Sequence, residues 1–302
     1  MQYSIIPSTD ISVSKVCLGT MTFGTPVAAQ DAEHLVHYAL GQGINFVDTA
    51  NMYEGYARVP GSAGGVAEEI VGHAISGHRH EYVVATKLGM KVGPGAEDEG
   101  TSPDAIRIQL ERSLKRLGTD YVDVYYLHRF DSNVEPGAIA KAMGEQMKAG
   151  KFRCWGVSNY TADQLSALLA ACKAENIPGP ALCQPALSLL YPAALEDMLP
   201  LCQREGIGVI PYQILQGGLL TGKYHRGQQA PAGSRAAEKP GWMKPMDDAA
   251  FDVIERVERD AASMGKTMTQ YCFHWALSQP AVISALVGVK REAQIDEAAA
   301  AL

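Results

Sequence analysis

Residues 82–87 read Tyr-Val-Val-Ala-Thr-Lys, and residues 122–128 read Val-Asp-Val-Tyr-Tyr-Leu-His. Both runs are apolar almost throughout, as expected for parallel strands that are buried on both faces. Between them, Ser102 and Pro103 are typical of a helix start, and Gly118 is typical of a helix end. This stretch therefore predicts a strand–helix–strand unit with parallel strands.

The same alternation continues along the whole chain. Strands are expected at residues 15–20, 45–50, 82–87, 122–128, 152–158, 181–186, 208–212 and 282–287. Helices are expected at 30–42, 66–76, 102–118, 136–149, from a capping box at Thr161 and Gln164 onward, 195–205, 248–264 with 268–279, and 291–302. Eight strand–helix units predict an α/β fold in which residues 1–302 form a single-domain (β/α)8 TIM barrel.

A doubly wound open sheet is the alternative fold. Such a sheet usually carries G-x-G-x-x-G after its first strand. Here residues 18–24 read Leu-Gly-Thr-Met-Thr-Phe-Gly, which does not fit, so no Rossmann domain is expected.

The composition is that of a globular chain, with 47% hydrophobic and 20% charged residues and a net charge of −7. An acidic balance argues against a nucleic-acid-binding protein, yet it permits a local basic pocket. The chain has neither an apolar run long enough for a membrane span nor a secretory signal, so a cytoplasmic location is expected. The six cysteines and eight histidines show no metal-binding spacing, which predicts buried thiols and no metal site.

One long irregular segment, residues 224–246, is rich in Gly, Pro, Gln and Ala. It follows the seventh expected strand and so belongs to the rim of the barrel that usually carries the active site. Segments of this length are commonly either functional lids or disordered. Both interpretations stay open, with a lid over a cofactor or substrate preferred.

Four polar side chains stand at or just after strand ends: Asp48, Tyr53, Lys87 and His128. Each alone has an ordinary structural explanation, but together they suggest proton transfer with a phenol as the acid. A neighbouring ammonium is expected to lower the pKa of the phenol, and a carboxylate would keep that ammonium charged. An imidazole within reach would hydrogen-bond the phenol oxygen or a substrate carbonyl.

Several motifs together resemble the aldo-keto reductase superfamily, in particular a bacterial-type member of its potassium-channel-β-subunit-like branch. The motifs stand at residues 18–24, 43–53 (GINFVDTANMY), 84–87, 121–128, 156–160 and 219–224. The resemblance runs in order from about residue 3 to residue 298. It implies a barrel that binds a nicotinamide cofactor and reduces aldehydes or ketones with NADPH, or oxidises alcohols in reverse. The resemblance implies that Tyr53 is the proton donor, that Lys87 and Asp48 adjust its pKa, and that His128 orients the carbonyl.

The resemblance also implies two groups of cofactor-binding residues. At the nicotinamide end they are Gly19, Thr20, Met21, Ser158, Asn159, Gln184 and Tyr212. At the phosphate end they are Gln213, Leu215, Gly217, Lys223, Gly288, Lys290, Arg291 and Gln294. Adjacent cations at a helix start suit an additional phosphate, so NADPH/NADP+ is expected rather than NADH.

The chain departs from the family pattern at several positions. Gln213 and Ile214 stand where Ser-Pro is usual, Leu187 where an aromatic residue is common, and Ala298 where an asparagine is usual. The sequence ends at Leu302, whereas many members have a further tail. These differences are expected to affect contacts with the cofactor and the shape of the pocket. They do not involve Asp48, Tyr53, Lys87 or His128.

The partner expected is a small carbonyl or alcohol substrate. Its pocket is expected to draw on Phe23, Met90, Arg129, Phe130, Tyr191 and Trp242. This mixture suits a bulky, sugar-like or polycyclic carbonyl, and it sets neither the substrate nor the direction of reaction. Three alternatives stay open: an NADPH-binding regulatory barrel, an NADP-dependent secondary-alcohol dehydrogenase, and an isomerase or aldolase that uses Lys87 as a Schiff-base amine.

Overall fold

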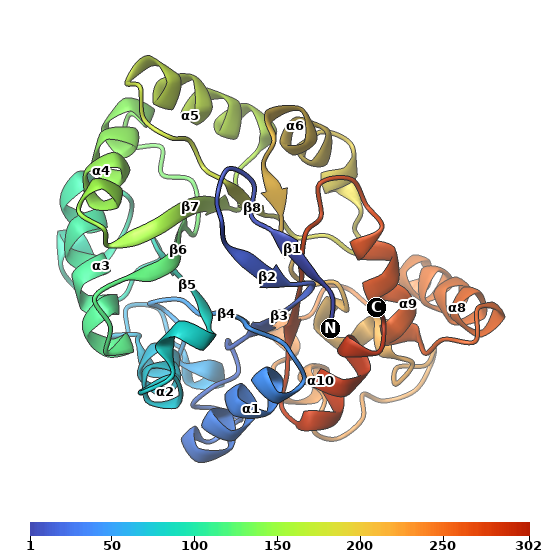
Figure 1. Ribbon diagram of the computed structural model, residues 1–302. Helices are drawn as coiled ribbons and strands as arrows, with labels where there is room; N and C mark the ends of the chain where they lie inside the picture. The colour runs from blue at the N-terminus through green and yellow to red at the C-terminus, as the bar shows by residue number, and fades with distance from the viewer.

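Each of the eight runs predicted as strands forms one in the computed structural model, which describes residues 1–302. They are β3 (Val16–Gly19), β4 (Phe46–Asp48), β5 (Val83–Leu88), β6 (Val122–Leu127), β7 (Phe152–Ser158), β8 (Leu182–Gln184), β9 (Gly208–Val209) and β10 (Ala285–Gly288). All are parallel, in the order β10-β3-β4-β5-β6-β7-β8-β9. Val209 also bridges Val282 in parallel, and Ile283 N donates to Val209 O at 3.0 Å, so the two edges meet. The fold is a (β/α)8 barrel, as predicted (Figure 1).

Helices surround the barrel in Figure 1. They are α1 (Ala29–Gly41), α2 (Val66–Ala74), α3 (Pro103–Leu117), α4 (Pro136–Lys148), α5 (Ala162–Ala174), α6 (Met198–Glu205), α7 (Arg235–Glu238), α8 (Asp248–Ser263), α9 (Met268–Leu277) and α10 (Glu292–Ala299). Short 3-10 turns are η1 (Gly55–Ala57), η2 (Arg79–Glu81), η3 (Ala96–Asp98), η4 (Ala193–Leu195), η5 (Gln216–Thr221) and η6 (Pro240–Trp242). None of these helices has the length and apolarity needed to cross a bilayer.

The predicted helix boundaries have the expected capping contacts. Ser102 Oγ accepts a hydrogen bond from Ala105 N at 3.2 Å, and Gly118 ends α3 in the left-handed region. At the start of α5, the Thr161 hydroxyl and the Gln164 side chain each bond the other residue's backbone N–H, forming the predicted capping box.

An N-terminal hairpin was not predicted. Strands β1 (Tyr3–Ile5) and β2 (Ser12–Ser14) pair antiparallel and lie across one end of the barrel in Figure 1. Ile6, Ile11 and Val13 are almost completely buried and join the side chains that fill the barrel interior. The hairpin therefore closes the end where the barrel strands begin, and the other end is left for the site.

Strand alternation decides which side chains reach that open end. Cys17, Phe46, Val124 and Leu182 belong to the interior cluster, whereas their neighbours in the strands pack against the surrounding helices. Two residues further along each strand, the same side of the pleat points inward again. The last inward positions are Gly19, Asp48, Lys87, His128, Ser158, Gln184 and Tyr212. Asp48, Lys87 and His128 thus belong to the uppermost layer inside the barrel, whereas Tyr53 stands in the segment after β4.

Residues 224–246 contain more regular structure than the sequence suggested. The short helix α7 is capped by Ser234, whose hydroxyl accepts from Ala237 N, and the turn η6 follows directly. All six cysteines are free and buried, in agreement with the expectation of buried thiols.

Candidate active site

A cavity of about 720 Å³ lies at the C-terminal ends of the barrel strands. All fifteen residues expected to contact a cofactor line it: Gly19, Thr20, Met21, Ser158, Asn159, Gln184, Tyr212, Gln213, Leu215, Gly217, Lys223, Gly288, Lys290, Arg291 and Gln294. Asp48, Tyr53 and His128 line it as well. Lys87 lies just behind this surface, fully buried.

The Lys87 ammonium holds three oxygen atoms together beneath the cavity. It pairs with Asp48 Oδ1, and it donates to Thr49 O at 2.8 Å and to Tyr53 Oη at 3.3 Å. The second carboxylate oxygen, Asp48 Oδ2, accepts from Gln184 Nε2 at 2.8 Å. Both charged groups are therefore compensated, which burial of an ion pair requires.

This set of contacts alters the protonation of Lys87 and Tyr53. Burial lowers the pKa of Lys87, but the Asp48 carboxylate and the Tyr53 oxygen outweigh it, and the pKa is raised overall. Burial raises the pKa of Tyr53, and the nearby Lys87 ammonium lowers it less. The ammonium thus acts on the pKa of this phenol in the expected direction, but desolvation of the phenolate is the larger effect, so the pKa is raised overall.

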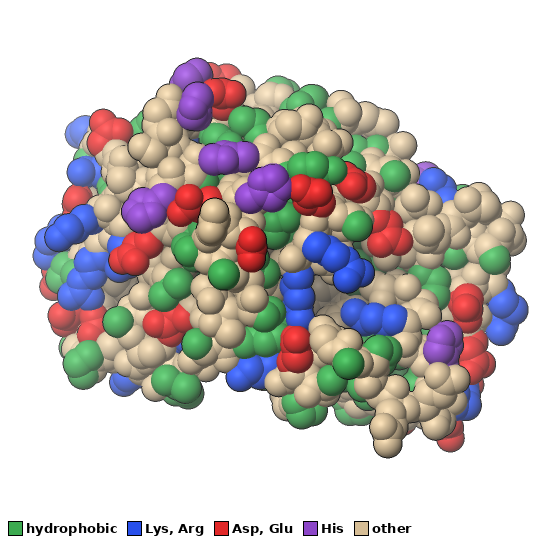
Figure 2. Space-filling model, turned by 90° about the horizontal axis from the view of Figure 1, so that it is seen from below, with side chains coloured by type: hydrophobic (Ala, Val, Ile, Leu, Met, Phe, Trp, Pro, Cys, Tyr) green, Lys and Arg blue, Asp and Glu red, His purple; other side chains and the backbone are tan.

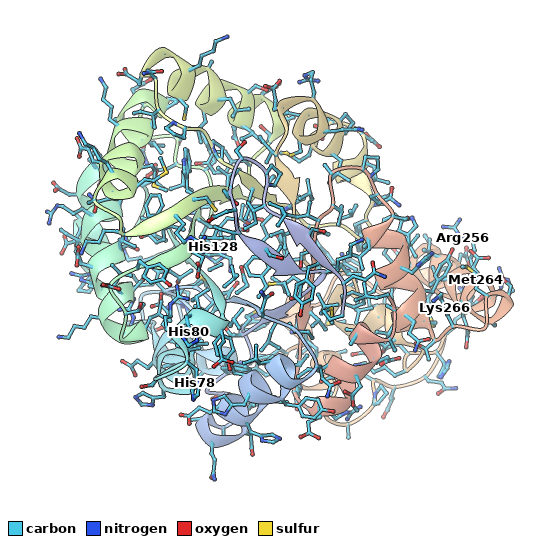
Figure 3. The ribbon with its side chains drawn as sticks, viewed as in Figure 1. His78, His80, His128, Arg256, Met264 and Lys266 are labelled. Atoms are coloured by element: carbon cyan, nitrogen blue, oxygen red, sulfur yellow. The ribbon has the colours of Figure 1, made fainter.

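His128 faces Tyr53 across the same layer. The two rings lie edge to face, with centroids 5.9 Å apart and planes at 79°. Burial, Lys87 and Arg129 together hold the pKa of His128 well below its usual value, so the imidazole is neutral near pH 7. Its buried Nδ1 has no hydrogen-bond partner. Figure 3 shows His128 within the ring of helices, whereas His78 and His80 lie near α2.

A hydrogen-bonded chain of polar side chains lies beside this layer. Tyr212 Oη donates to Asn159 Oδ1 at 2.6 Å, and Asn159 Nδ2 donates to His128 O at 2.8 Å and to Ser158 Oγ at 3.1 Å. Ser158 Oγ in turn donates to Gln184 O at 2.8 Å. The strand ends β6 to β9 are thereby tied to one another, and Asn159, which makes three of these bonds, has a left-handed backbone with φ 57°.

The opposite end of the cavity is cationic. Lys223, Arg235, Lys290 and Arg291 line it. Burial and the three neighbouring cations lower the pKa of Lys223. Among the four, only Lys290 is paired with a carboxylate, Glu238 Oε2 at 2.5 Å. Figure 2 shows Lys and Arg side chains around a hollow in the surface.

At this end of the cavity, two glycines let the backbone lie close to the Lys223 ammonium. Gly217 and Gly218 have φ of 66° and 98°, in the region that favours glycine. A Cβ at Gly218 would lie 2.5 Å from Lys223 Nζ. Clustered cations beside glycine backbone that lines a cavity are groups that bind phosphate, so the donor set fits a dinucleotide phosphate.

Comparison with known proteins agrees with this geometry. A family model described as the aldo/keto reductase family matches residues 15–302. The chain belongs to the aldo/keto reductase family. It is therefore an oxidoreductase, as expected, and the family generally uses a nicotinamide cofactor.

Several relatives are similar over almost their whole length. A probable voltage-gated potassium channel subunit beta of Arabidopsis thaliana is 33% identical, covering 98% of this chain and 90% of that protein. The L-glyceraldehyde 3-phosphate reductase of Escherichia coli K12 is 29% identical, covering 100% and 88%. Among solved structures, the glycerol dehydrogenase AKR11B4 from Gluconobacter oxydans superposes with a TM-score of 0.81 at 29% identity, covering 98% and 89%.

The expected substrate-pocket residues of this aldo/keto reductase are placed differently from one another. Met90 lines the cavity. Phe23 does not, because its side chain is fully buried in the core between strands and helices. Phe130 packs edge-on against Tyr160, with ring centroids 5.5 Å apart.

The remaining three stand outside the cavity wall. Arg129 pairs with Glu99 instead of facing the cavity. Tyr191 and Trp242 are exposed at 37% and 42%. Trp242 meets the cavity only through Tyr56, whose ring centroid is 5.4 Å from its own.

Tyr56 and Arg235 are among the lining residues that were not singled out from the sequence. Arg235 Nε donates to Tyr56 Oη at 3.3 Å, although the residues are 179 positions apart. They come from η1 and α7, short elements without a hydrophobic period, so no local pattern marks them. Met52 also lines the cavity, and only its position directly before Tyr53 in the sequence could have indicated this.

Proposed function

We propose that this protein reduces aldehydes or ketones to alcohols with NADPH, reversibly, with Tyr53 as proton donor. The observation that carries the proposal is the position of Tyr53 Oη, 3.3 Å from the Lys87 ammonium and beside the neutral His128, in the wall of the cavity. A phenol placed against an ammonium can lose a proton to a substrate oxygen and remain stabilised as the phenolate.

The cofactor would extend from Tyr212 and Asn159 to the four cations at the far end of the cavity. Lys290 and Arg291 would hold the phosphate that distinguishes NADPH from NADH. Gly217, Gly218 and Lys223 would accommodate the pyrophosphate. When bound, the nicotinamide supplies the hydride.

Tyr53 and His128 would orient the carbonyl by hydrogen bonds to its oxygen. The neutral imidazole can donate one N–H, and it does so without bringing a second charge to the site. As negative charge develops on the carbonyl oxygen, the proton on Tyr53 Oη moves to it. Lys87 then stabilises the phenolate, while Asp48 and Gln184 keep the ammonium in place.

We also propose that residues 231–238 form a lid over the cofactor; we call this segment the strap. Its residues 231–235 line the cavity, and Lys290 Nζ donates to Gly233 O at 3.2 Å. The strap is anchored on one side, where Ala236 N donates to Tyr224 Oη at 3.3 Å. Deleting residues 228–239 is expected to speed cofactor release about tenfold by stopped-flow fluorescence. An unchanged release rate would make the strap a passive loop.

The similarity to a potassium channel subunit favours a second candidate, an NADPH-binding regulatory barrel with little turnover. The geometry of the four polar residues does not separate the two, because binding and turnover use the same cavity. Oxidation of a secondary alcohol is the same chemistry in reverse, and a glycerol dehydrogenase is among the similar structures.

Fluorescence titration with NADPH and NADH at matched salt, followed by turnover with a panel of aldehydes and ketones, tests the proposal. Tight binding of NADPH, weak binding of NADH and consumption of NADPH with a carbonyl would support it. Tight binding without turnover in either direction would favour the regulatory barrel. Failure to bind either dinucleotide would overturn both.

A further inference from the structure

The cavity has a reacting end, near Tyr53 and His128, and a cationic far end, where one aromatic side chain contacts two of the cations. Tyr56 lines the cavity, and so do Arg235 and Lys290. The Lys290 ammonium lies 5.1 Å from the centre of the Tyr56 ring, and the Arg235 guanidinium lies 5.9 Å from it. At both distances a cation is attracted to the face of an aromatic ring. Tyr56 is only 6% exposed, so water weakens these contacts little.

Backbone contacts hold Tyr56 in place. Its N–H donates to Thr25 O at 2.6 Å, and a Cβ at the preceding Gly55 would lie only 1.9 Å from the same oxygen. Turn η1 therefore rests directly on the segment between β3 and α1. The Trp242 ring also packs against the Tyr56 ring, with centroids 5.4 Å apart and planes at 77°. A ring that is held in this way can fix the position of the longer side chains that contact it.

The two cations that contact Tyr56 come from distant parts of the sequence. Arg235 is the first residue of α7, in the strap, and Lys290 stands between β10 and α10. Like charges repel one another at this end of the cavity. Burial, and then the charges of its three cationic neighbours, lower the pKa of Lys223. An attractive partner therefore helps to keep these side chains together when no anion is bound.

An aromatic ring attracts a cation without neutralising it. A carboxylate such as Glu238, which pairs with Lys290, has to be displaced before a phosphate can take its place. The Tyr56 ring takes up none of the N–H donors of the two cations, and its hydroxyl accepts only from Arg235 Nε, at 3.3 Å. The terminal nitrogens of Arg235 thus keep their donors for a phosphate.

Resting on the proposed function, we propose that Tyr56 raises the affinity for the phosphate that distinguishes NADPH from NADH, because its ring holds Lys290 and Arg235 where that phosphate binds. The ring stays in contact with both cations in the complex, and their N–H groups donate to the phosphate. Tyr56 is a positioning residue for the cofactor and takes no part in proton transfer. Only protein molecules whose cations are already in place bind phosphate without rearrangement, so loss of the ring lowers the apparent affinity.

Two substitutions of Tyr56, compared by fluorescence titration, test the proposal. Tyr56→Leu removes the ring and is expected to weaken binding of NADPH about tenfold and that of NADH less than about threefold. Tyr56→Phe keeps the ring and loses only the long hydrogen bond from Arg235, so NADPH affinity should stay within about twofold. Unchanged or tighter binding of NADPH by Tyr56→Leu would overturn the proposal, because the ring would then be neutral or would compete with the phosphate.

Fluorinated phenylalanines at position 56 separate the attraction of the ring for cations from its packing. Each fluorine reduces the negative potential on the ring face and changes the shape of the ring little. Replacing Tyr56 by phenylalanine with one, two and three fluorine atoms is expected to weaken NADPH stepwise, toward the affinity of Tyr56→Leu. Equal affinity across the series would overturn the proposal, since packing alone would then explain the loss in Tyr56→Leu.

Tyr121→Leu is the matched control. The Arg79 guanidinium lies 4.3 Å from the centre of the Tyr121 ring, and Tyr121 directly precedes β6, at the closed end of the barrel and away from the cavity. Both dinucleotides are expected to bind this variant within about twofold of the wild type.

A variant without the two cations shows whether the ring acts through them. In protein that already carries Arg235→Ala and Lys290→Ala, adding Tyr56→Leu should weaken NADPH by less than about twofold, because the ring has no cation left to hold. A further loss as large as that in the wild-type background would overturn the proposal.

Binding of adenosine 2′,5′-bisphosphate and of AMP, measured by calorimetry, needs neither turnover nor the nicotinamide. Tyr56→Leu is expected to weaken the bisphosphate about tenfold and AMP less than about threefold. Reduction of a carbonyl with NADPH, together with equal affinities across the fluorinated series, would overturn the inference and leave the proposed function standing. The expected loss of bisphosphate affinity, in a protein that reduces no carbonyl, would overturn the proposed reductase activity alone.

Discussion

The cations at the two ends of the cavity differ in whether a carboxylate pairs with them. At the far end, Lys223, Arg235 and Arg291 have no carboxylate within ion-pair distance. Just outside the cavity wall at the reacting end, Lys91 and Arg129 share a carboxylate, Glu99. The pairing distinguishes them, because an anion binds where a positive charge is left without a partner.

At the far end, the chain also holds positive charges close together, and this makes protonation of Lys223 less favourable. The three neighbouring cations help to lower the pKa of Lys223, and an incoming phosphate would relieve that repulsion. The reacting end has its one buried ammonium, Lys87, held by a buried carboxylate. The far end is therefore suited to binding an anion, and the reacting end is suited to transferring a proton.

The largest effect is expected from Tyr53→Phe at the reacting end. Loss of the phenol should lower carbonyl reduction about a thousandfold, because general acid catalysis typically contributes on that order. Affinity for NADPH, measured by fluorescence titration, should change less than about twofold, since the cations lie at the other end. Tyr56→Phe is the control for loss of a phenol hydroxyl, because Tyr56 lines the same cavity and its hydroxyl accepts a hydrogen bond from Arg235 at the cationic end. Normal turnover by Tyr53→Phe would remove Tyr53 as the acid.

A smaller effect is expected from changing the cationic end. Lys290→Ala combined with Arg291→Ala should weaken NADPH binding about a hundredfold, since two charge-assisted contacts to one phosphate are lost. NADH lacks that phosphate, so its affinity should change less than about threefold. Titration of the variant with both dinucleotides measures the difference. Equal weakening of the two would contradict the assignment of these residues to the extra phosphate.

A modest effect is expected at the one compensated cation of that end. Glu238 lies in the strap and pairs with Lys290, with its Oε2 2.5 Å from Lys290 Nζ. Glu238→Gln should tighten NADPH about threefold, because the phosphate no longer competes with a partly exposed carboxylate. NADH should be unaffected. Weaker binding of both dinucleotides would instead indicate that Glu238 latches the strap over any cofactor. Glu258→Gln, on α8, serves as the control for loss of one negative charge.

The smallest effect is expected from pH. Tyr53 must be protonated to act as an acid, and its pKa is raised above the ordinary value of a phenol. His128 has a pKa well below its ordinary value, so it stays neutral. The rate of the reduction step should therefore be level between about pH 6 and about pH 9 and fall only as Tyr53 deprotonates at higher pH. Single-turnover measurements check this, and a decline centred near neutrality would contradict a protonated Tyr53 beside a neutral His128.

The strands and the layer of site residues were accessible from the sequence because both follow simple periods. Apolar runs mark strands that are buried on both faces, and the two-residue alternation carries Asp48, Lys87 and His128 inward. The hairpin of β1 and β2 was not accessible, since three-residue, partly exposed strands leave almost no periodic signal.

Long-range arrangement accounts for the remaining errors. Phe23 follows a strand end, as site residues do, yet its turn directs it into the core. Arg235 and Tyr56 reach the cavity only because distant segments fold over it. The direction of the Tyr53 pKa shift depended on weighing burial against one ammonium, and burial is a property of the folded chain.

The junction between β10 and β3 has a consequence for how the chain resists unfolding. Gly288 pairs in register with Gly19, Thr22 Oγ1 donates to Val289 O at 2.7 Å across 267 positions, and Lys290 follows on the far side. The cavity therefore straddles the seam at which the first and last barrel strands meet. A dinucleotide lying across that seam would act as a removable crosslink between the two ends of the chain. Bound cofactor is therefore expected to slow proteolysis of the folded chain, because it stabilises the state in which the two strands are joined.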